Sequence, residues 1–156
     1  MPAVVSLASG CGAHLSDYGG GFPHWDICRF LVENGATRRL KPRPLKGPVL
    51  VHTPCTLENV LGTSESVFEL LGVIPEIELT ELGRRGDCCG AGGLTFLSHS
   101  RMSRALRAPF REAMARHGGG CLITSNFGCG FHLVGDLKGW SHLHPVTLVA
   151  RQLKDG

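Results

Sequence analysis

Two adjacent cysteines, Cys88 and Cys89, open directly into a run of glycines, and this stretch constrains the fold more than any other. Neighbouring thiols rarely pair with each other, because a disulfide needs a separation of the two Cβ atoms that adjacent residues seldom reach. Gly90, Gly92 and Gly93 lack a Cβ atom and allow positive φ, so the backbone can wrap closely around whatever both sulfurs touch. The stretch therefore predicts a bulky inorganic ligand, held by these two thiols and by others from elsewhere in the chain.

The size and composition indicate one ordinary globular domain. A chain of 156 residues can bury a real core, and no apolar run approaches the roughly 18 residues of a membrane span. The formal charge of +3 is too small to imply a nucleic-acid partner, and an aromatic fraction of 6% offers few stacking platforms. The sequence predicts a protein that does not bind nucleic acid.

The cysteines indicate metal or redox chemistry. The amino terminus lacks the zones of a signal peptide, so we expect a cytoplasmic protein whose seven cysteines are kept reduced. An odd number of thiols in a reducing compartment favours a metal site over a disulfide framework.

Strand signals and helix signals alternate along the chain. Short apolar runs predict strands at 4–8, 49–51, 77–79 and 121–124, of which the first two are expected to be buried. Helical periodicity predicts helices over 25–34, 64–71 and 98–117 and a last helix from Pro145, while 140–144 fits no single class. Pro109 is expected to kink the third helix or to divide it in two, and Met102, Leu106, Phe110 and Ala113 are expected to form its apolar face. This alternation predicts an α/β fold, a mostly parallel sheet flanked by helices.

Five of the seven cysteines follow strand candidates. Ligands of such sheets gather beyond the carboxyl ends of the strands. We therefore expect cysteine-bearing loops to converge on one rim, with Cys11, Cys55, Cys88, Cys89 and Cys129 as the thiols involved. Cys28 and Cys121 lie on predicted core faces and are expected to be inert.

One short string occurs twice, which indicates a duplicated unit. Residues 10–15 recur as 128–133 with five of six positions identical, each time behind an apolar strand. We expect 1–36 to be the tail of a first cysteine-rich unit, 37–48 a basic, proline-containing linker, and 49–156 a complete second unit. The chain is thus expected to be the tail of a longer two-unit protein.

The spacing of these residues resembles the cysteine-rich CCG-domain family, whose pattern is a cysteine, about three dozen residues, Cys-Cys-Gly, a similar gap and Cys-x-x-Cys. Here 32 residues separate Cys55 from Cys88, and 35 residues separate Gly90 from Asn126, which occupies the first position of the last element. With this asparagine, the string from His52 to Leu57 and the closing 144–146, the chain resembles the carboxyl-terminal part of glycolate oxidase iron-sulfur subunits.

The resemblance implies an iron-sulfur protein that accepts electrons from a flavin-containing subunit, which oxidises glycolate or another 2-hydroxy acid. It implies a 4Fe-4S cluster, and in some relatives a non-cubane cluster with five cysteines per unit. It also implies a protein that does not span the membrane, with a peripheral position at the inner membrane. Four thiolates is the usual number for such a cluster, and Cys55, Cys88, Cys89 and Cys129 meet it, with Cys11 as a candidate fifth.

Other interpretations of the thiols remain open at this point. Four thiolates also suit zinc, although adjacent ligands fit a polynuclear group better than one tetrahedral ion. The domain could lack a cluster and only dock on the flavin subunit, or the adjacent pair could act as a thiol redox switch. In each case no catalytic residue is expected, because chemistry on the substrate would belong to a partner.

Overall fold

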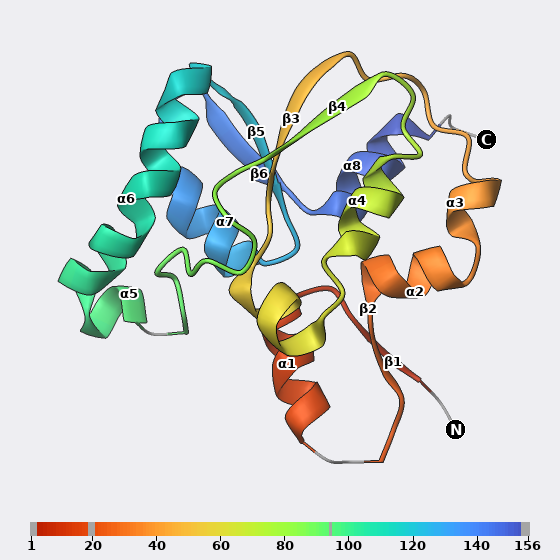
Figure 1. Cartoon of the computed structure of the whole chain (residues 1–156), viewed down its shortest axis with the longest axis horizontal. Helices are drawn as coiled ribbons and strands as arrows, with labels where there is room; N and C mark the ends of the chain where they lie inside the picture. Colours follow the sequence, from red (N-terminus) through yellow and green to blue (C-terminus); the bar gives the residue numbers. More distant parts are fainter. Residues whose placement is uncertain (1–2, 19–20, 94, 154–156) are drawn as a thin grey trace.

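The computed structural model describes residues 3–18, 21–93 and 95–153, which form an α/β fold built on parallel strands (Figure 1). The strands are β1 Val4–Ser6, β2 His24–Asp26, β3 Gly47–His52, β4 Ile77–Glu81, β5 Gly120–Thr124 and β6 Trp140–Leu143. The helices are α1 Ser9–Asp17, α2 Ile27–Glu33, α3 Ala36–Arg39, α4 Glu65–Leu71, α5 Thr95–Ser98, α6 Ser100–His117, α7 Phe127–Val134 and α8 Pro145–Gln152, with a π-helical segment η1 Leu57–Leu61. The predicted fold class, a parallel sheet flanked by helices, is confirmed.

The main sheet contains four parallel strands in the order β4-β3-β5-β6. The chain runs from β3 outward to β4 and then returns to β5 on the other side of β3, so the strand order reverses between β3 and β5. In open α/β sheets, a crevice forms outside the carboxyl ends of the strands at such a reversal. The topology therefore places the expected ligand site beyond the ends of β3 and β5.

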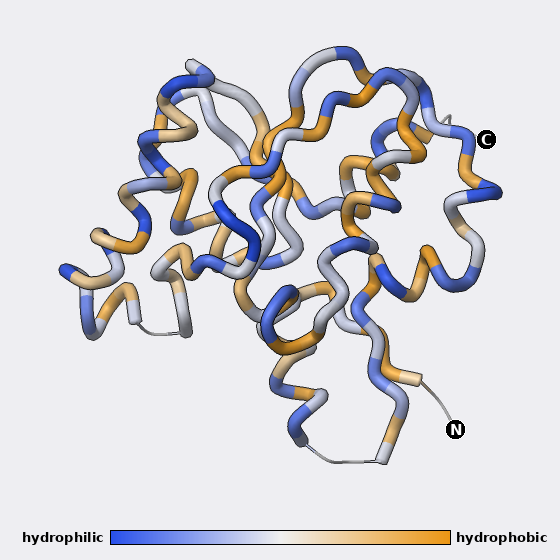
Figure 2. Tube along the Cα trace, in the orientation of Figure 1, coloured by the Kyte–Doolittle hydropathy of each residue, from blue (hydrophilic) through white to orange (hydrophobic). Residues whose placement is uncertain are grey.

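The core lies on both faces of this sheet. Leu50 and Leu122 pack on one face, and the next residues in each strand, Val51 and Ile123, pack on the other, because successive strand side chains point to opposite sides. Figure 1 shows α6 and α7 over the first face and α4 and α8 over the second. Hydrophobic residues gather where these helices meet the strands (Figure 2).

The amino-terminal segment differs from its prediction. Its strand ends at Ser6, and Val4 and Val5 are 36% and 37% exposed, so the expected buried strand over 4–8 is wrong. The cysteine that follows lies in α1 and not in a loop. Gly10 and Gly12 there pack so closely against neighbouring side chains that this packing offsets the low helix propensity of glycine.

The helix expected from Trp25 begins later, at Ile27. Asp26 caps it, since its carboxylate accepts a hydrogen bond from the backbone N–H of Cys28 at 2.9 Å. Trp25 belongs to β2 instead. Cys28 is fully buried in the core, as predicted.

Pro109 lies inside one helix, α6, so the division into two helices is wrong. A proline removes one backbone hydrogen bond, here that of the carbonyl of Ala105, and both residues are exposed, so water can satisfy this carbonyl. The predicted apolar face is only half correct. Phe110 is buried, but Met102 and Leu106 are 50% and 38% exposed, because this end of the helix extends beyond the sheet.

The basic segment expected as a linker is packed against the rest of the protein. Leu40 and Leu45 contact the core, and the backbone N–H of Arg43 donates to the carbonyl of Gln152 at 2.7 Å. Pro42 forms an isolated bridge with Leu153. The division of the chain into two units at this segment stays a prediction.

The repeat seen in the sequence extends over a whole structural unit. β1-α1-β2-α2 has the same order of elements as β5-α7-β6-α8, and each strand pair is parallel. In the first unit Val4 is the register partner of His24, and in the second unit Leu122 is the register partner of His142. The interval in sequence from Val4 to Leu122 equals the interval from His24 to His142, and it also equals the interval from Cys11 to Cys129. The duplicated part is therefore a βαβα unit and not only a short loop.

The two copies differ in their surroundings. Leu122 and Ile123 are fully buried because β5 pairs with β3 on its other side. Their counterparts Val4 and Val5 belong to a two-stranded sheet, and they stay exposed. Burial of the strand thus depends on the neighbouring β3-β4 segment, which only one copy has in this structure.

We expect His52 to make stability depend on pH. It ends β3, its Nδ1 contacts the hydroxyl of Thr124 at 3.1 Å, and its ring edge packs against Phe110. Burial lowers the pKa of His52 to about 4, against about 6.5 when unfolded. The contribution of the neutral ring is complete above pH 6.5 and is lost as the pH falls toward 4, about 2 kcal/mol of it between pH 7 and pH 5.

Urea unfolding at pH 7, 6 and 5 under reducing conditions measures this effect. The matched variant is His52→Asn, which keeps a polar atom near Thr124 but does not titrate. The free energy of unfolding should fall with pH more steeply for the wild type than for this variant. Equal slopes would show that the His52 ring is not the group responsible.

Candidate metal centre

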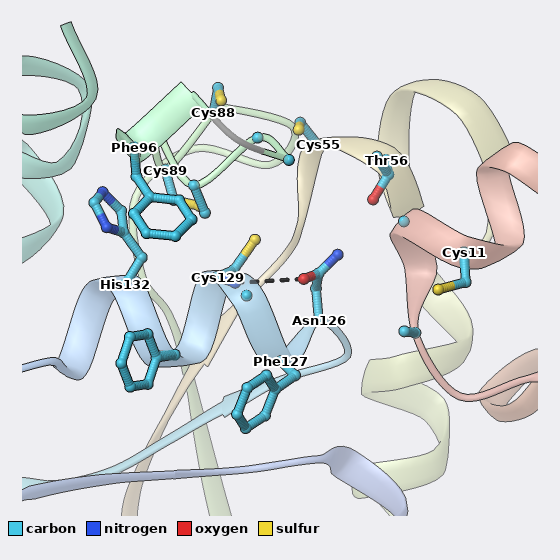
Figure 3. Close-up of a pocket in the computed structure, with 17 residues that line it drawn as sticks. Cys11, Cys55, Thr56, Cys88, Cys89, Phe96, Asn126, Phe127, Cys129 and His132 are labelled. Atoms are coloured by element: carbon cyan, nitrogen blue, oxygen red, sulfur yellow. Dashed lines mark hydrogen bonds between the residues drawn. The ribbon is translucent and has the colours of Figure 1, made fainter. Parts of the chain in front are cut away.

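Five cysteines line one cavity of about 540 Å³ at the carboxyl ends of the strands (Figure 3). Cys55 follows β3, Cys88 and Cys89 follow β4, and Cys129 lies in the first turn of α7 after β5. Cys11 comes from the first turn of α1, which follows β1 of the smaller sheet. The structure thus brings the five sequence-predicted thiols to one site, through four separate segments.

Burial differs among these thiols. Cys89 and Cys129 are buried at 2% and 7% exposure, Cys55 is half-buried, and Cys88 and Cys11 are exposed. In Figure 3, Cys11 stands on the α1 side of the cavity, apart from the other four. Cys55, Cys88, Cys89 and Cys129 therefore form the main group of sulfurs.

The glycine after the cysteine pair is required by its neighbours. Gly90 has a φ of +84°, and a Cβ atom there would lie 2.5 Å from the backbone oxygen of Ser103 in α6. The Ser103 hydroxyl donates to the Gly90 carbonyl at 2.8 Å, and the Gly90 N–H donates to the sulfur of Cys88 at 3.4 Å. Gly90 thus fixes the cysteine loop on α6 and directs its N–H toward the sulfur of Cys88.

Asn126 caps the helix that carries Cys129. Its side-chain oxygen accepts a hydrogen bond from the backbone N–H of Cys129 at 3.3 Å. In the sequence, the cysteine pattern identifies Asn126 only as the residue that replaces a thiol, and it does not indicate a capping role. An asparagine directly before a helical segment is a common N-cap signal, and it could have revealed this role.

Burial and crowding shift the pKa values of the thiols. Burial raises the pKa of Cys55, and the neighbouring Cys88 and Cys89 raise it further. Cys89 and Cys129 share a hydrogen bond between their side chains, which lowers the pKa of Cys89 and, together with burial, raises the pKa of Cys129. Ionisation of one thiol of this pair therefore opposes ionisation of the other. Several thiolates here at once need a positive centre between them.

The protein supplies little positive charge to the cavity. Among the described residues that line it, none is a lysine or an arginine. The first turns of α1 and α7 do line it, and the amino-terminal end of a helix carries a partial positive charge. This partial charge favours thiolates but cannot neutralise four of them.

The thiols surround a space and not a point. Among residues 3–18, 21–93 and 95–153, no three His, Cys, Asp or Glu side chains are placed so that they could hold one metal ion. A cavity of this volume, with soft sulfur ligands around it and no lysine or arginine among its described lining residues, fits a polynuclear metal-sulfur group. The donor set therefore fits such a group better than a single zinc ion.

Aromatic side chains form the outer part of the cavity. Phe127 and Phe131 stack on each other along α7, and Phe96 packs against the ring of His132. These residues were not singled out by the sequence, because an isolated phenylalanine gives no signal that distinguishes a cavity wall from a core. Phe127 and Phe131 are 72% and 60% exposed, so the mouth of the cavity is apolar.

The other two cysteines, His52 and His14 lie away from the cavity, whereas His132 lines it. Cys28 and Cys121 pack against the core and do not line the cavity, as predicted. His52 is buried between β5 and α6 and makes no contact with the cavity. Of the two repeated histidines, His132 lines the cavity and bonds to Ser103, whereas His14 is exposed beside Tyr18.

Comparison with known proteins agrees with this geometry. The model of a family described as a cysteine-rich domain, CCG, matches residues 49–134. The chain belongs to the cysteine-rich CCG-domain family. The matched range contains Cys55, Cys88, Cys89 and Cys129, whereas Cys11 lies outside it.

Several curated proteins are similar to this member of the family. One subunit of the anaerobic glycerol-3-phosphate dehydrogenase of Escherichia coli strain K12 is 33% identical over 124 residues, covering 78% of this chain and 30% of the relative. The glycolate oxidase iron-sulfur subunit of the same strain is 29% identical over 147 residues, covering 84% and 35%. One subunit of the CoM/CoB fumarate reductase of Methanothermobacter marburgensis is 27% identical over 139 residues, covering 86% and 28%. The chain thus spans about a third of the length of these relatives.

We expect Gly90→Ala to destabilise the protein by about 3 kcal/mol, because it combines backbone strain with a steric conflict. Gly93→Ala is the matched control, since Gly93 also has positive φ, at +56°, but a Cβ atom there would meet nothing within 4 Å. The free energy of unfolding of the control should fall by only about 1 kcal/mol. Urea unfolding of both variants measures the difference. Equal decreases in the free energy of unfolding of the two variants would mean that α6 shifts to make room for the added methyl group.

Proposed function

We propose that the chain is an iron-sulfur electron-transfer domain. Cys55, Cys88, Cys89 and Cys129 would hold the cluster, and Cys11 would stand at its edge as an additional thiol. The observation that carries this proposal is the gathering of these sulfurs around one cavity without lysine or arginine among its described lining residues. A relative of the chain, the glycolate oxidase subunit, is itself named as an iron-sulfur protein.

The protein residues would control the environment of the cluster. When bound, such a cluster takes up and releases single electrons at a potential set by charge, hydrogen bonds to sulfur and burial. The Gly90 N–H donates to the sulfur of Cys88, and the first turns of α1 and α7 direct partial positive charge toward the thiolates. Phe96, Phe127 and Phe131 limit the access of water.

The finer assignment is an electron carrier in a glycolate or related 2-hydroxy acid dehydrogenase, accepting electrons from a flavin-containing subunit. Two of the relatives are named as subunits of a glycolate oxidase and a glycerol-3-phosphate dehydrogenase, which supports such a partner. An odd number of cysteines, seven, fits a reducing compartment such as the cytoplasm better than a disulfide framework. In the part of the chain that the structure describes, no helix is long and apolar enough to cross a bilayer. A peripheral position at the inner membrane is part of the same proposal.

A thiol redox switch is the second candidate, and one contact favours it. Cys89 and Cys129 already share a hydrogen bond between their side chains. Loss of two electrons and two protons to a disulfide acceptor would join their sulfurs directly. Cys55 and Cys88 share a side-chain hydrogen bond in the same way, but Cys89 and Cys129 are the more buried pair, and neither is the adjacent pair that the sequence suggests.

Anaerobic reconstitution with ferrous iron and sulfide tests the first candidate. The wild type should become coloured and hold stoichiometric iron and sulfide. Single replacements of Cys55, Cys88, Cys89 and Cys129 by serine should each lower iron retention by at least about tenfold, because they remove a ligand. Cys121→Ser is the matched control, since Cys121 packs away from the cavity, and it should behave as the wild type.

A colourless wild-type protein without iron would overturn the cluster. If oxidation also lowers the number of alkylatable thiols by two, and this decrease is absent in Cys89→Ser, the redox switch explains the site. If its alkylation count does not change but it co-purifies with a flavin subunit, it is a docking domain without a cluster.

A further inference from the structure

Asn126 occupies the position that is a cysteine in the Cys-x-x-Cys pattern, yet both its amide oxygen and its amide nitrogen form hydrogen bonds. Its oxygen accepts from the backbone N–H of Cys129, and its nitrogen donates to the hydroxyl of Ser9 at 3.3 Å. In Figure 3 it stands between the α7 side and the α1 side of the cavity. The amide therefore bridges two walls of the site.

Ser9 joins these walls to a third. It is fully buried at the start of α1, and its hydroxyl also accepts a hydrogen bond from Thr56 at 2.9 Å. Thr56 directly follows Cys55, and the backbone N–H of Ser9 donates to the carbonyl of Ser125 at 3.1 Å. The segments that carry Cys55, Cys129 and Cys11 thus meet at one hydroxyl group.

Packing holds the amide in this place. A Cβ atom on Gly10 would lie 3.1 Å from the amide nitrogen of Asn126, and one on Gly128 would lie 3.3 Å from its oxygen. The side chain therefore packs tightly against two glycines, and an added Cβ atom at either one would push the amide from its place. Turning the amide into the cavity would break both hydrogen bonds.

The tie matters because α1 belongs to a different sheet from the other walls. The strand before it, β1, pairs with β2, whereas Cys55, Cys88 and Cys89 follow β3 and β4 of the main sheet. No backbone ladder between these two sheets is present among the described residues. The distance between the α1 wall and the main group of thiols therefore depends on individual contacts, namely the backbone bond from Ser9 to Ser125 and the side-chain bonds of Asn126 and Thr56 to the Ser9 hydroxyl.

We propose that Asn126 and Ser9 are positioning residues that set the spacing of the thiol-bearing walls, and that Asn126 is not a ligand position left vacant. This inference rests on the proposed function for its relevance to a cluster. The tie itself is a property of the iron-free protein. Its two parts can therefore be tested separately.

Asn126→Cys separates the two interpretations of this position. If the residue were a vacant ligand position, the added thiol would increase iron retention. If it is a tie, the variant should lose iron to a chelator about fivefold faster than the wild type, because two hydrogen bonds are removed. Retention equal to or above the wild type would overturn the proposal.

Ser9→Ala tests the tie with the loss of a single oxygen atom. Ser125→Ala is the matched control, because Ser125 is equally buried, lies beside Asn126 and has a hydroxyl with no hydrogen-bond partner among the described residues. Ser9→Ala should shift the electron paramagnetic resonance spectrum of the reduced, reconstituted protein, and the control should not. A lower yield of Ser9→Ala with an unchanged spectrum would overturn the positioning role.

Hydrogen exchange of the iron-free protein gives the second readout. Peptides that cover the first turns of α1 and α7 should exchange about fivefold faster in Ser9→Ala than in the wild type or Ser125→Ala. Equal exchange in all three proteins would overturn the tie, whether or not iron binds. Faster exchange in Ser9→Ala, together with a wild type that binds no iron, would refute the proposed function and support the tie.

Discussion

The fold of this protein has to hold several thiols close together in an apolar cavity, where their thiolate forms repel one another. Sulfurs that are buried and close together oppose each other's ionisation, as the raised pKa of Cys129 indicates. Such crowding is stable only with the thiols protonated or with a metal cation among them. The fold therefore has to hold four segments in place without the help of attraction between their functional groups. A parallel sheet does this by ending several strands at one edge, and the contacts of Gly90 and Asn126 fix the segments that follow.

The sequence predicted the parts of the site that follow from strand order. A short apolar run before each thiol was enough to place Cys55, Cys88, Cys89 and Cys129 near one another, because parallel strands share a carboxyl edge. It did not predict that Cys11 and Cys129 lie in helices. Strings rich in glycine indicate loops, and close packing against Gly10 and Gly130 offsets the low helix propensity of glycine there. Their packing partners are distant in sequence, so local patterns do not reveal them.

The same limit explains the errors in the outer elements. Met102 and Leu106 follow helical periodicity, but periodicity does not tell how far a helix extends beyond the sheet that it covers. Val4 and Val5 form a strand with the composition of a core strand, yet they lie in a two-stranded sheet and stay exposed. The duplicated βαβα unit makes this visible within one chain, since the same pattern is buried in one copy and exposed in the other.

The thiols become more exposed from the floor of the cavity to its mouth. Cys89 and Cys129 lie at the floor, whereas Cys88 and Cys11 meet solvent. Oxidants arriving from outside therefore reach the outer sulfurs first, and sulfenic acid forms most readily on exposed thiols. The inner pair is shielded by its burial below the outer sulfurs. Oxidation in air would accordingly begin at Cys88 and Cys11 and spare Cys89 and Cys129. The site is most vulnerable while no metal group is bound to the outer thiols.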